Sequence, residues 1–329
     1  MPTIVVTGGA GFIGSHIAEE CAKEGHSVLI IDNLDDYYPP ETKRRNLEAV
    51  LRTGDVRFVH GDVTNLEFLK TILRKDVEYV FHEAAYPGVQ SSIRNPLKST
   101  QVNVFGTLCV LQASLETNVK RVINASSSSV YGDVKCLPMK ETESAHPISP
   151  YGASKLGAEH YCRLFYEING LPTVSLRYFT VYGPRMRPDL AIATFFSRAL
   201  RNEEIAIFGD GKRTRDFTNV EDVVRANMRL MRTSEADGKV MNIGSGKGIS
   251  IDSLASSIRE IAHSNSEIKH YGSQKGDVEH TLADISLAKE LIEYEARVEL
   301  ERGLRGYMGW LEAKRCANGF GVSGAEMSK

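Results

Sequence analysis

Three polar residues near the middle of the chain have types and spacing suited to acid–base chemistry. Tyr151 and Lys155 are four residues apart, so they share one face of a helix that is entered through Pro150. A tyrosine is a poor base at its usual pKa of about 10, but a neighbouring ammonium and a positive cofactor ring favour the phenolate and lower that pKa. Ser127 can donate a hydrogen bond to a substrate hydroxyl or accept one from it. Alone, a Tyr–Lys pair of this spacing also arises by chance on helix surfaces.

A glycine-rich segment near the start of the chain predicts a dinucleotide-binding turn. Gly8, Gly11 and Gly14 follow the apolar run Thr3–Thr7 and open a helix. Gly8 permits the tight turn, Gly11 lets the backbone approach a pyrophosphate, and Gly14 lets helix and strand pack closely. The N-terminus of that helix presents free N–H groups to the anion. A glycine turn without a ligand is the alternative.

Acidic residues at the ends of the next two apolar runs indicate which dinucleotide binds. Asp32 can accept hydrogen bonds from the adenosine ribose and would repel a 2′-phosphate, so the sequence predicts NAD rather than NADP. The alternative is that Asp32 only caps the following loop. Asp62 and Val63 follow the third run and are placed to meet the adenine edge. The basic run Lys43–Arg45 is expected to be a solvated helix face.

The elements that must position these residues alternate as far as about residue 176. Short runs of Val, Ile and Phe predict strands buried on both faces, and helical spacing lies between them, as in Ser15–Glu24 and Phe68–Arg74. The predicted strands are Thr3–Thr7, Ser27–Ile31, Val56–His60, Tyr79–His82, Arg121–Ala125 and Thr173–Leu176. Right-handed crossovers then give an α/β fold with a doubly wound, Rossmann-type parallel sheet.

Beyond residue 177 the pattern is less regular and predicts a second, smaller α/β domain. Ala193–Leu200 is expected to be helical, Val240–Gly246 to form a strand and turn, and Ser250 to cap a helix that runs to about Ala262. The Gly/Ser-rich residues 317–329 are expected to form a flexible tail.

Composition excludes several other classes of function. The chain has 329 residues, 42% hydrophobic and 25% charged, with a net charge of −2, which argues against nucleic acid as a partner. No run approaches the ~18 apolar residues of a membrane span, and the apolar start is expected to be a strand. Five scattered cysteines and the histidines lack metal-ligand spacing, so we expect no metal site and a reducing, cytoplasmic location.

Several long motifs in one order extend this interpretation. They are TGGAGFIGSH (7–16), IDNL (31–34), SSSSVYGD (126–133), SPYGASK (149–155), LRYFTVYGPRMRPD (176–189) and FGDGKRTRDFTNVEDVV (208–224). With these motifs the chain resembles the extended short-chain dehydrogenase/reductases, and among them the UDP-glucose and UDP-N-acetylglucosamine 4-epimerases. The resemblance implies an NAD-binding Rossmann domain over residues 1–176 and about 216–245. It implies a nucleotide-sugar-binding domain over 177–215 and 246–316.

The resemblance also implies a reaction. Tyr151 takes the 4-hydroxyl proton while hydride leaves C4 for NAD, Lys155 tunes Tyr151 and holds the cofactor, and Ser127 helps to move the proton. The 4-keto sugar then turns and receives the hydride on its other face, so NAD stays tightly bound. The implied cofactor-binding residues are Gly8, Gly11, Phe12, Ile13, Gly14, Asp32, Asn33, Asp62, Val63, Ala84, Ala85, Tyr86, Asn103, Tyr151 and Lys155. Glu83 stands where the family more often has an apolar residue.

Dehydrating relatives carry an Asp–Glu pair where this chain has Ser128 and Ser129, and decarboxylating relatives carry a Glu at the position of Ser129. Two serine hydroxyls supply neither the acid nor the base that loss of water needs. The resemblance therefore favours epimerisation.

The substrate residues implied by the resemblance are Ser127, Tyr151, Thr180, Phe208, Arg215, Lys275, Asp277 and Thr281. Arg215 matches the arginine that clamps the diphosphate, and Phe208 is expected to stack on uracil. Thr180 replaces the family's usual Asn. Thr281 stands where relatives vary a pocket-gating residue, and a small side chain there would admit a 2-N-acetyl group.

One further difference concerns the diphosphate. Gln274 replaces the family's second diphosphate arginine, which leaves Lys275 as a substitute point charge.

The sequence thus favours a cytoplasmic, NAD-dependent UDP-hexose 4-epimerase acting on UDP-glucose and UDP-galactose, on UDP-GlcNAc and UDP-GalNAc, or on both. A UDP-glucuronate 4-epimerase or another nucleotide-sugar enzyme of the family is the alternative, and a non-catalytic nucleotide-sugar or NAD sensor is a further one. In the family, two helices pair across a two-fold axis. Pro96–Glu116 and Tyr151–Ile168 match them, so we expect a homodimer. The alternative is that their apolar residues pack on the sheet; these are Val104, Leu108, Leu111, Leu164 and Phe165.

Overall fold

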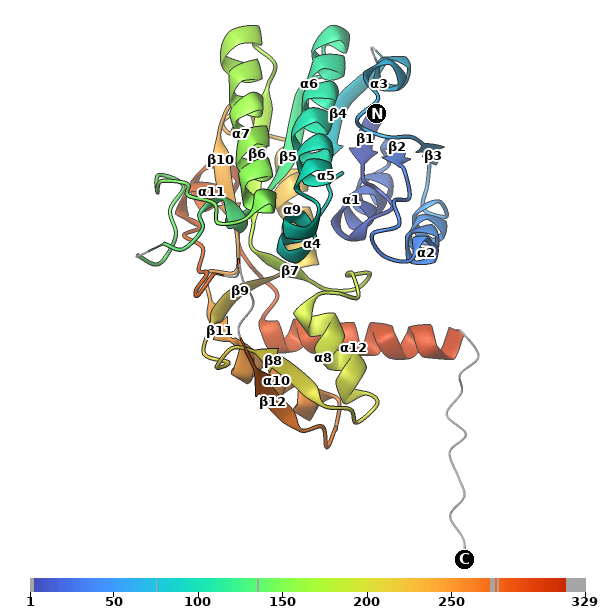
Figure 1. The fold of residues 1–329 in the computed structure, drawn as a ribbon. Coiled ribbons are helices and arrows are strands. Elements are labelled where there is room, and N and C mark those ends of the chain that lie inside the picture. Colours follow the sequence, from blue (N-terminus) through green and yellow to red (C-terminus); the bar gives the residue numbers. More distant parts are fainter. Residues whose placement is uncertain (1–2, 75, 135, 273–275, 277, 318–329) are drawn as a thin grey trace, which may run out of the picture.

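The computed structural model describes residues 3–317, apart from 75, 135, 273–275 and 277 (Figure 1). A seven-stranded sheet lies at its centre, in the order β10-β6-β5-β4-β1-β2-β3, and every strand pair in it is parallel. Its strands are β1 (Thr3–Thr7), β2 (Ser27–Asp32), β3 (Val56–His60), β4 (Val77–His82), β5 (Arg121–Ser127), β6 (Thr173–Tyr178) and β10 (Val240–Ile243). The predicted doubly wound α/β fold is confirmed.

Helices cover both faces of this sheet, and β1 shows why. Its alternating side chains point to opposite faces, so Ile4 and Val6 join one hydrophobic cluster while Val5 joins another. The first cluster packs against α1 (Phe12–Lys23), α2 (Pro40–Val50) and α9 (Val220–Arg229). The second packs against α3 (Leu66–Ile72), α6 (Gly106–Thr117) and α7 (Pro150–Asn169), which form the front layer in Figure 1.

The strand order creates a switch point between β1 and β4. The chain moves outward from β1 to β2 and β3, then crosses back to place β4 on the other side of β1. Parallel strands end at one edge of a sheet, and ligands of open α/β sheets bind there at such a switch point. The predicted glycine turn and serine run both lie at this edge, after β1 and at the end of β5.

The helical layer beside β4 and β5 is less regular than the sequence predicts. Instead of one helix over Pro96–Glu116, a π-turn at Gln101–Phe105 joins α5 (Pro96–Thr100) to α6. The short helix α4 (Val89–Arg94) precedes α5. Single π-turns within helices are frequent at functional sites.

The start of α7 is fixed by its own residues. The Ser149 side chain accepts a hydrogen bond from the Gly152 N–H, and Pro150 occupies the first turn. Gly170 ends the helix in the left-handed conformation. The strand beneath the start of α7, β5, ends at Ser127, and a 3₁₀ turn at Ser128–Val130 follows it.

The remaining elements form a smaller lobe below the sheet edge in Figure 1. Its sheets are β11-β9-β7 and β12-β8, built from β7 (Thr180–Tyr182), β8 (Ile205–Phe208), β9 (Thr214–Asn219), β11 (Gly248–Ser250) and β12 (Ile268–Tyr271). Its helices are α8 (Ala191–Ala199), α10 (Ile251–Ile261) and α12 (Leu300–Ala317), while α11 (Ser286–Ile292) contacts β10. The domain bounds drawn from the sequence stay a prediction. The predicted tail lies outside the described residues, apart from Ala317.

Two findings concern the described part of the chain only. None of its helices is long and apolar enough to cross a membrane. Within the same residues, no group of three or more His, Cys, Asp or Glu side chains is arranged to hold a metal ion.

Candidate active site

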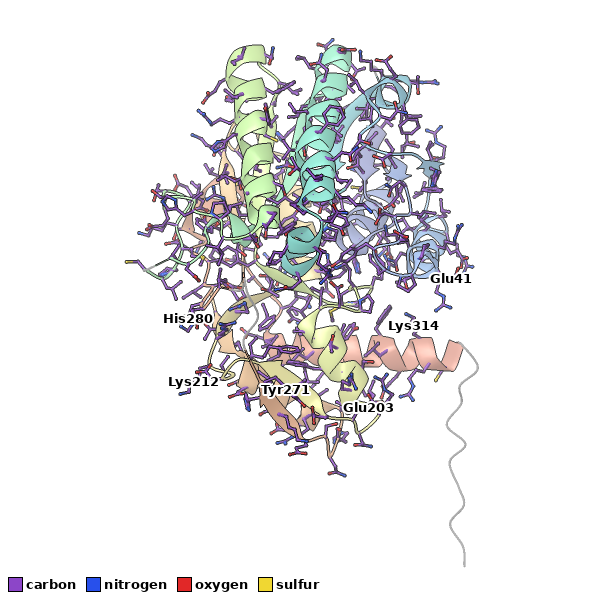
Figure 2. The ribbon with its side chains drawn as sticks, viewed as in Figure 1. Glu41, Glu203, Lys212, Tyr271, His280 and Lys314 are labelled. Atoms are coloured by element: carbon purple, nitrogen blue, oxygen red, sulfur yellow. The ribbon has the colours of Figure 1, made fainter. Side chains whose placement is uncertain are left out.

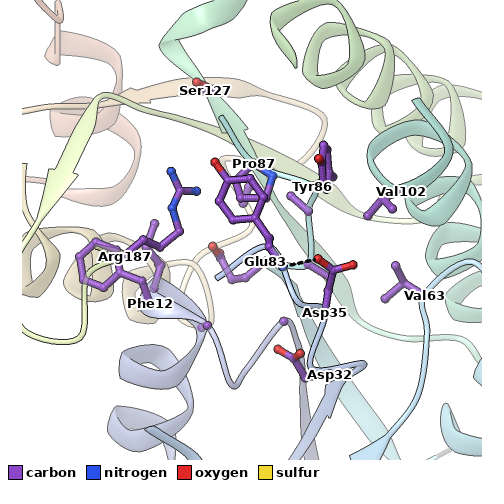
Figure 3. A pocket seen from close by; sticks show the side chains of 18 of the residues that line it. Phe12, Asp32, Asp35, Val63, Glu83, Tyr86, Pro87, Val102, Ser127 and Arg187 are labelled. Carbon is purple, nitrogen blue, oxygen red and sulfur yellow. Dashed lines mark hydrogen bonds between the residues drawn. The ribbon is translucent and has the colours of Figure 1, made fainter. Parts of the chain in front are cut away.

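A cavity of about 310 Å³ opens at the carboxyl ends of β1, β2, β4, β5 and β6 (Figure 3). Most residues that the sequence predicts for the site line it: Gly8, Gly11, Phe12, Ile13, Gly14, Asp32, Asn33, Asp62, Val63, Ala84, Ala85, Tyr86, Ser127, Tyr151, Lys155 and Thr180. Asn103 lies behind the wall of the cavity, where its side chain hydrogen-bonds the backbone of Tyr86.

The glycine turn leaves no room for side chains. Gly8 has a φ of +69°, and a Cβ on it would come within 2.6 Å of the Ala84 nitrogen. A Cβ on Gly14 would come within 2.5 Å of the Gly8 carbonyl oxygen. Helix α1 starts at Phe12, and its N-cap residue Gly11 has no side chain to cap it, so the first N–H groups of the helix are left for a ligand at the cavity edge. This cradle fits a dinucleotide pyrophosphate.

Asp32 ends β2 and connects the two sides of the cradle. Its carboxylate accepts the Ala10 N–H at 3.1 Å and the Leu34 N–H at 2.8 Å. The Nζ of Lys43 lies 3.8 Å from the same carboxylate. Lys43 is buried and lines the cavity, so the expectation that Lys43–Arg45 is a solvated face is wrong for this residue. Helix α2 turns Lys43 inward toward Asp32 and leaves Arg44 and Arg45 exposed.

The next pair of cavity residues is joined in the same way. Asn33 donates from Nδ2 to the Asp62 carboxylate at 2.8 Å. The other Asp62 oxygen accepts the backbone N–H and the hydroxyl of Thr64. These bonds lower the pKa of Asp62 against the opposing effect of its burial. The loops after β2 and β3 therefore form one wall.

The three acid–base residues meet where β5 and α7 approach each other. Ser127 is the last residue of β5, and its hydroxyl donates to Ser129 Oγ at 3.1 Å. It also lies close enough to the Tyr151 phenol to lower the pKa of that group. Tyr151 and Lys155 occupy the first turns of α7. Lys155 is 4% exposed and donates from Nζ to the Ala125 carbonyl at 2.7 Å. The hydroxyl, phenol and ammonium thus lie together at one end of the cavity.

The pKa of Tyr151 differs from the expectation. Burial raises it above its ordinary value, while Arg187 and the Ser127 hydroxyl oppose that rise. Burial also lowers the pKa of Lys155 to about 8, and Glu83 opposes this shift. In the protein alone, desolvation therefore outweighs the expected lowering of the Tyr151 pKa by Lys155.

Besides Lys43, three charged residues that the sequence did not assign to the site line the cavity: Asp35, Glu83 and Arg187 (Figure 3). Arg187 pairs with Asp189 through Nε and Nη2, at 3.0 and 3.3 Å. Its guanidinium also lies over the Tyr37 ring, 5.3 Å from the centroid. The motif LRYFTVYGPRMRPD contains Arg187, but nothing in the sequence shows that this arginine faces the cavity rather than solvent.

The other predicted substrate residues lie elsewhere. Phe208 is 51% exposed and contacts Tyr271, which Figure 2 shows low on the small lobe. Arg215 donates to the carbonyl groups of Thr214, Val278 and Glu279, and the buried hydroxyl of Thr281 accepts the Asp216 N–H. Of the described residues in this predicted set, Ser127, Tyr151 and Thr180 line the cavity, and the three just named (Phe208, Arg215, Thr281) do not. Gln274, Lys275 and Asp277 lie outside the described residues.

The sheet, the glycine cradle and the Ser–Tyr–Lys cluster together define a dinucleotide-dependent enzyme of the Rossmann class. Comparison with known proteins narrows this class. Residues 4–244 match the model of the NAD dependent epimerase/dehydratase family. The UDP-glucuronate 4-epimerase of Thermodesulfobacterium geofontis is 35% identical over 93% of this chain and 95% of its own length.

Solved structures of UDP-sugar 4-epimerases have the same fold as this chain. The UDP-glucose 4-epimerase of Thermotoga maritima, solved with UDP-glucose, is 38% identical with a TM-score of 0.88, covering 95% of this chain and 99% of that one. The UDP-glucuronic acid 4-epimerase of Bacillus cereus, solved with UDP-glucuronic acid and NAD, is 34% identical with a TM-score of 0.90 and the same coverage. The chain belongs to the NAD dependent epimerase/dehydratase family. It is an NAD-dependent isomerase.

Proposed function

We propose that this protein is a UDP-sugar 4-epimerase and that UDP-glucuronate is its preferred substrate. The observation that carries the proposal is that one cavity holds Ser127, Tyr151, Lys155 and the guanidinium of Arg187. Within the described residues, the contacts of Arg187 with Asp189 use Nε and Nη2, which leaves Nη1 for a ligand. An arginine beside an acid–base cluster suits a carboxylate on the reacting sugar. The hydroxyl of Thr180 adds a donor in the same cavity.

In this proposal each cavity residue has one role in the reaction. NAD supplies the hydride acceptor and donor. Tyr151 takes the proton of the C4 hydroxyl and returns it, and the Ser127 hydroxyl stabilises its phenolate. Lys155, fixed by the Ala125 carbonyl, keeps a positive charge close to the phenolate. The Arg187 guanidinium anchors the C6 carboxylate while the 4-keto sugar turns.

The alternatives are UDP-glucose and UDP-GlcNAc, whose sugars are uncharged and which the sequence favours. Initial rates distinguish them from UDP-glucuronate. Purified protein is mixed, without added NAD, with UDP-glucuronate, UDP-glucose or UDP-GlcNAc, and the C4 epimer is followed by proton NMR. We expect kcat/KM for UDP-glucuronate to exceed the others by about tenfold or more, the value of one charge-assisted hydrogen bond. A higher value for UDP-GlcNAc would reject the assignment and restore the argument from Thr281.

We also propose a homodimer formed through the front helical layer. Leu97 on α5 is 82% exposed, Phe105 in the π-turn is 50% exposed and Ile168 near the end of α7 is 74% exposed. Figure 1 shows α5 and α7 in front of the sheet. These residues replace part of the expected set, because Leu111 is fully buried against the sheet. Light scattering at micromolar concentration should give twice the chain mass, and Leu97→Glu should give a monomer. A monomeric wild type contradicts the proposal.

A cytoplasmic location also remains a proposal. It is supported by Cys136 and Cys316, which are exposed and free of disulfides, as suits a reducing compartment.

A further inference from the structure

Glu83 is a half-buried acid in the wall of the cavity, and the reaction described above has no use for it. It directly follows His82, the last residue of β4, and its N–H still donates to the Thr7 carbonyl of β1 at 3.1 Å. The extended backbone thus continues by one residue, which sends the two side chains to opposite faces. His82 contacts the hydroxyls of Thr7 and Thr107 on the α6 side. Glu83 turns to the other side, toward α9, and lines the cavity together with Tyr151 and Lys155.

The hydrogen bonds around Glu83 fix it as an acceptor. Asn227 on α9 donates from Nδ2 to the Val223 carbonyl at 2.9 Å and to the Tyr178 hydroxyl at 2.8 Å. A carbonyl can only accept, so the amide orientation of Asn227 is determined. The Tyr178 hydroxyl receives one of these bonds and donates its own proton to Glu83 Oε1 at 2.9 Å.

The orientation of the Asn227 amide favours donation toward Tyr178 and, through it, toward Glu83. The Oδ1 of Asn227 is buried and has no hydrogen-bond partner within the described residues. A buried polar atom without a partner is unfavourable. The Asn227 amide nevertheless leaves its oxygen without a donor, while both of its N–H groups have acceptors. Asn227 and Tyr178 therefore direct a hydrogen-bond donor at Glu83, which stabilises its carboxylate form.

The charged and titratable groups around Glu83 come from several elements. Tyr178 on β6 donates to it, Lys155 on α7 attracts it, and Tyr151 on the same helix interacts with its charge. Burial raises the pKa of Glu83 to about 7, against the effects of Tyr178 and Lys155. An added positive charge in the cavity would therefore favour the carboxylate form.

We propose that Glu83 makes the cavity discriminate between the two redox forms of the dinucleotide and bind the oxidised form more tightly. Reduction adds one hydride, that is one proton and two electrons, and removes the positive charge of the nicotinamide ring. A fixed carboxylate in the cavity attracts the cationic ring and gains nothing from the neutral one.

This preference suits an epimerase. Oxidation breaks the C4–H bond and transfers its electron pair with the proton as hydride to the cofactor, while the hydroxyl proton passes to Tyr151. Because Glu83 favours the oxidised cofactor, it favours return of the hydride to C4, and the sugar leaves as an alcohol rather than as a ketone. This last consequence rests on the proposed function, whereas the redox preference requires only that NAD binds.

The test needs no sugar. Purified protein is equilibrated with a mixture of NAD and NADH until the bound ratio is constant. Free nucleotide is then removed, and bound NADH is measured by its absorbance at 340 nm against total bound nucleotide. We expect Glu83→Gln to lower the bound ratio of oxidised to reduced cofactor by about tenfold, the effect of one nearby charge. Glu83→Asp should stay close to wild type.

Glu141→Gln is the matched control. Glu141 is a half-buried carboxylate that accepts the Asn242 N–H and does not line the cavity. A purely structural role of Glu83 would lower the melting temperature and the total cofactor content but would leave the bound ratio unchanged. An unchanged ratio in Glu83→Gln overturns the proposal.

A second variant covers poor folding of Glu83→Gln. Glu83→Leu combined with Tyr178→Phe removes the charge and its direct donor together, so that only one amide hydrogen of Asn227 loses its partner. The same fall in the ratio is expected, and an unchanged ratio overturns the proposal. Since no sugar is present, a failed epimerase assay with a shifted ratio rejects only the proposed function. Epimerisation with an unshifted ratio rejects only the role of Glu83.

Discussion

Asn103 holds both backbone polar groups of Tyr86. Its Oδ1 accepts the Tyr86 N–H at 2.7 Å, and its Nδ2 donates to the Tyr86 carbonyl at 3.1 Å. The same Nδ2 donates to Ser154 Oγ at 2.9 Å, which ties the cavity wall to α7. Asn103 lies in the π-turn at Gln101–Phe105 and is 1% exposed. A residue behind the cavity thus fixes the shape of its wall.

Replacing Asn103 by Leu should weaken NAD binding. The Tyr86 N–H and carbonyl would lose buried partners, at a cost of about 2–3 kcal/mol in the free energy of unfolding. We expect about tenfold weaker NAD binding, measured by retention of cofactor through gel filtration and by calorimetry. Ser154→Ala removes the third partner of Asn103 and leaves both Tyr86 bonds. Equal cofactor loss in the two variants would show that the Tyr86 bonds are not responsible.

Gly14→Ala should disrupt the cradle. Its Cβ would come within 2.5 Å of the Gly8 carbonyl oxygen, a backbone atom that cannot rotate away. We expect a loss of about 2–3 kcal/mol of stability and of bound NAD. The control is Gly309→Ala on α12, where a Cβ meets nothing within 4 Å and a helical alanine should stabilise by about 0.5–1 kcal/mol. Thermal melting of both variants checks the contrast, and a well-folded Gly14→Ala protein that retains NAD would contradict it.

Arg187→Leu should reduce activity on UDP-glucuronate far more than activity on UDP-glucose. If its guanidinium binds the sugar carboxylate, kcat/KM for UDP-glucuronate should fall about 100-fold, or about 3 kcal/mol, while that for UDP-glucose falls less than about fivefold. Asp189→Asn removes the partner of Arg187 and should leave the preference for UDP-glucuronate intact or strengthen it. Equal losses on both substrates would mean that Arg187 supports the loop and does not choose the sugar.

Acid should destabilise the protein through His82. Burial lowers the pKa of this side chain to about 3, so in the folded state it stays neutral where the unfolded state binds a proton. Between pH 6.5 and 3 the unfolded state therefore binds more protons, and stability falls as pH falls, by up to about 1.4 kcal/mol per pH unit. Urea unfolding at pH 6.5 and 5.0 should show this slope in wild type.

His82→Asn should be less stable than wild type at pH 6.5, because it loses contacts with Thr7 and Thr107, but it should lose less on acidification. The buried His16 contributes a similar slope to both proteins and cancels in the comparison. Parallel pH profiles of the two proteins would rule out His82 as the source.

The strands of the central sheet were predictable because they are short apolar runs. β5 and β6 are buried throughout, whereas the edge strand β3 is only partly buried. β1 and β3 have the predicted bounds, while β5 extends two residues further because Ser126 and Ser127 are buried polar residues that apolarity does not mark. The π-turn at Gln101–Phe105 was not predictable, since its residues continue the helical pattern.

For the site, the sequence could predict the residues whose spacing is local. Tyr151 and Lys155 share a helix face, and the glycines share one turn. The orientations of Lys43 and Arg187 depend on how α2 and the loop after β7 pack against the sheet, so one-dimensional patterns could not indicate them. Glu83 accepts a hydrogen bond from Tyr178, which in turn accepts one from Asn227. Both residues are far from Glu83 in sequence, so only the fold brings the three together.

Isotope tracing tests the central claim that C4 is oxidised and then receives its own hydride back. UDP-glucuronate carrying deuterium at C4 is incubated with the protein in ordinary water, without added NAD, and the product is examined by NMR. We predict UDP-galacturonate that retains deuterium at C4, and no product with Tyr151→Phe. Product with hydrogen at C4, or full activity of the Tyr151→Phe protein, would contradict the account.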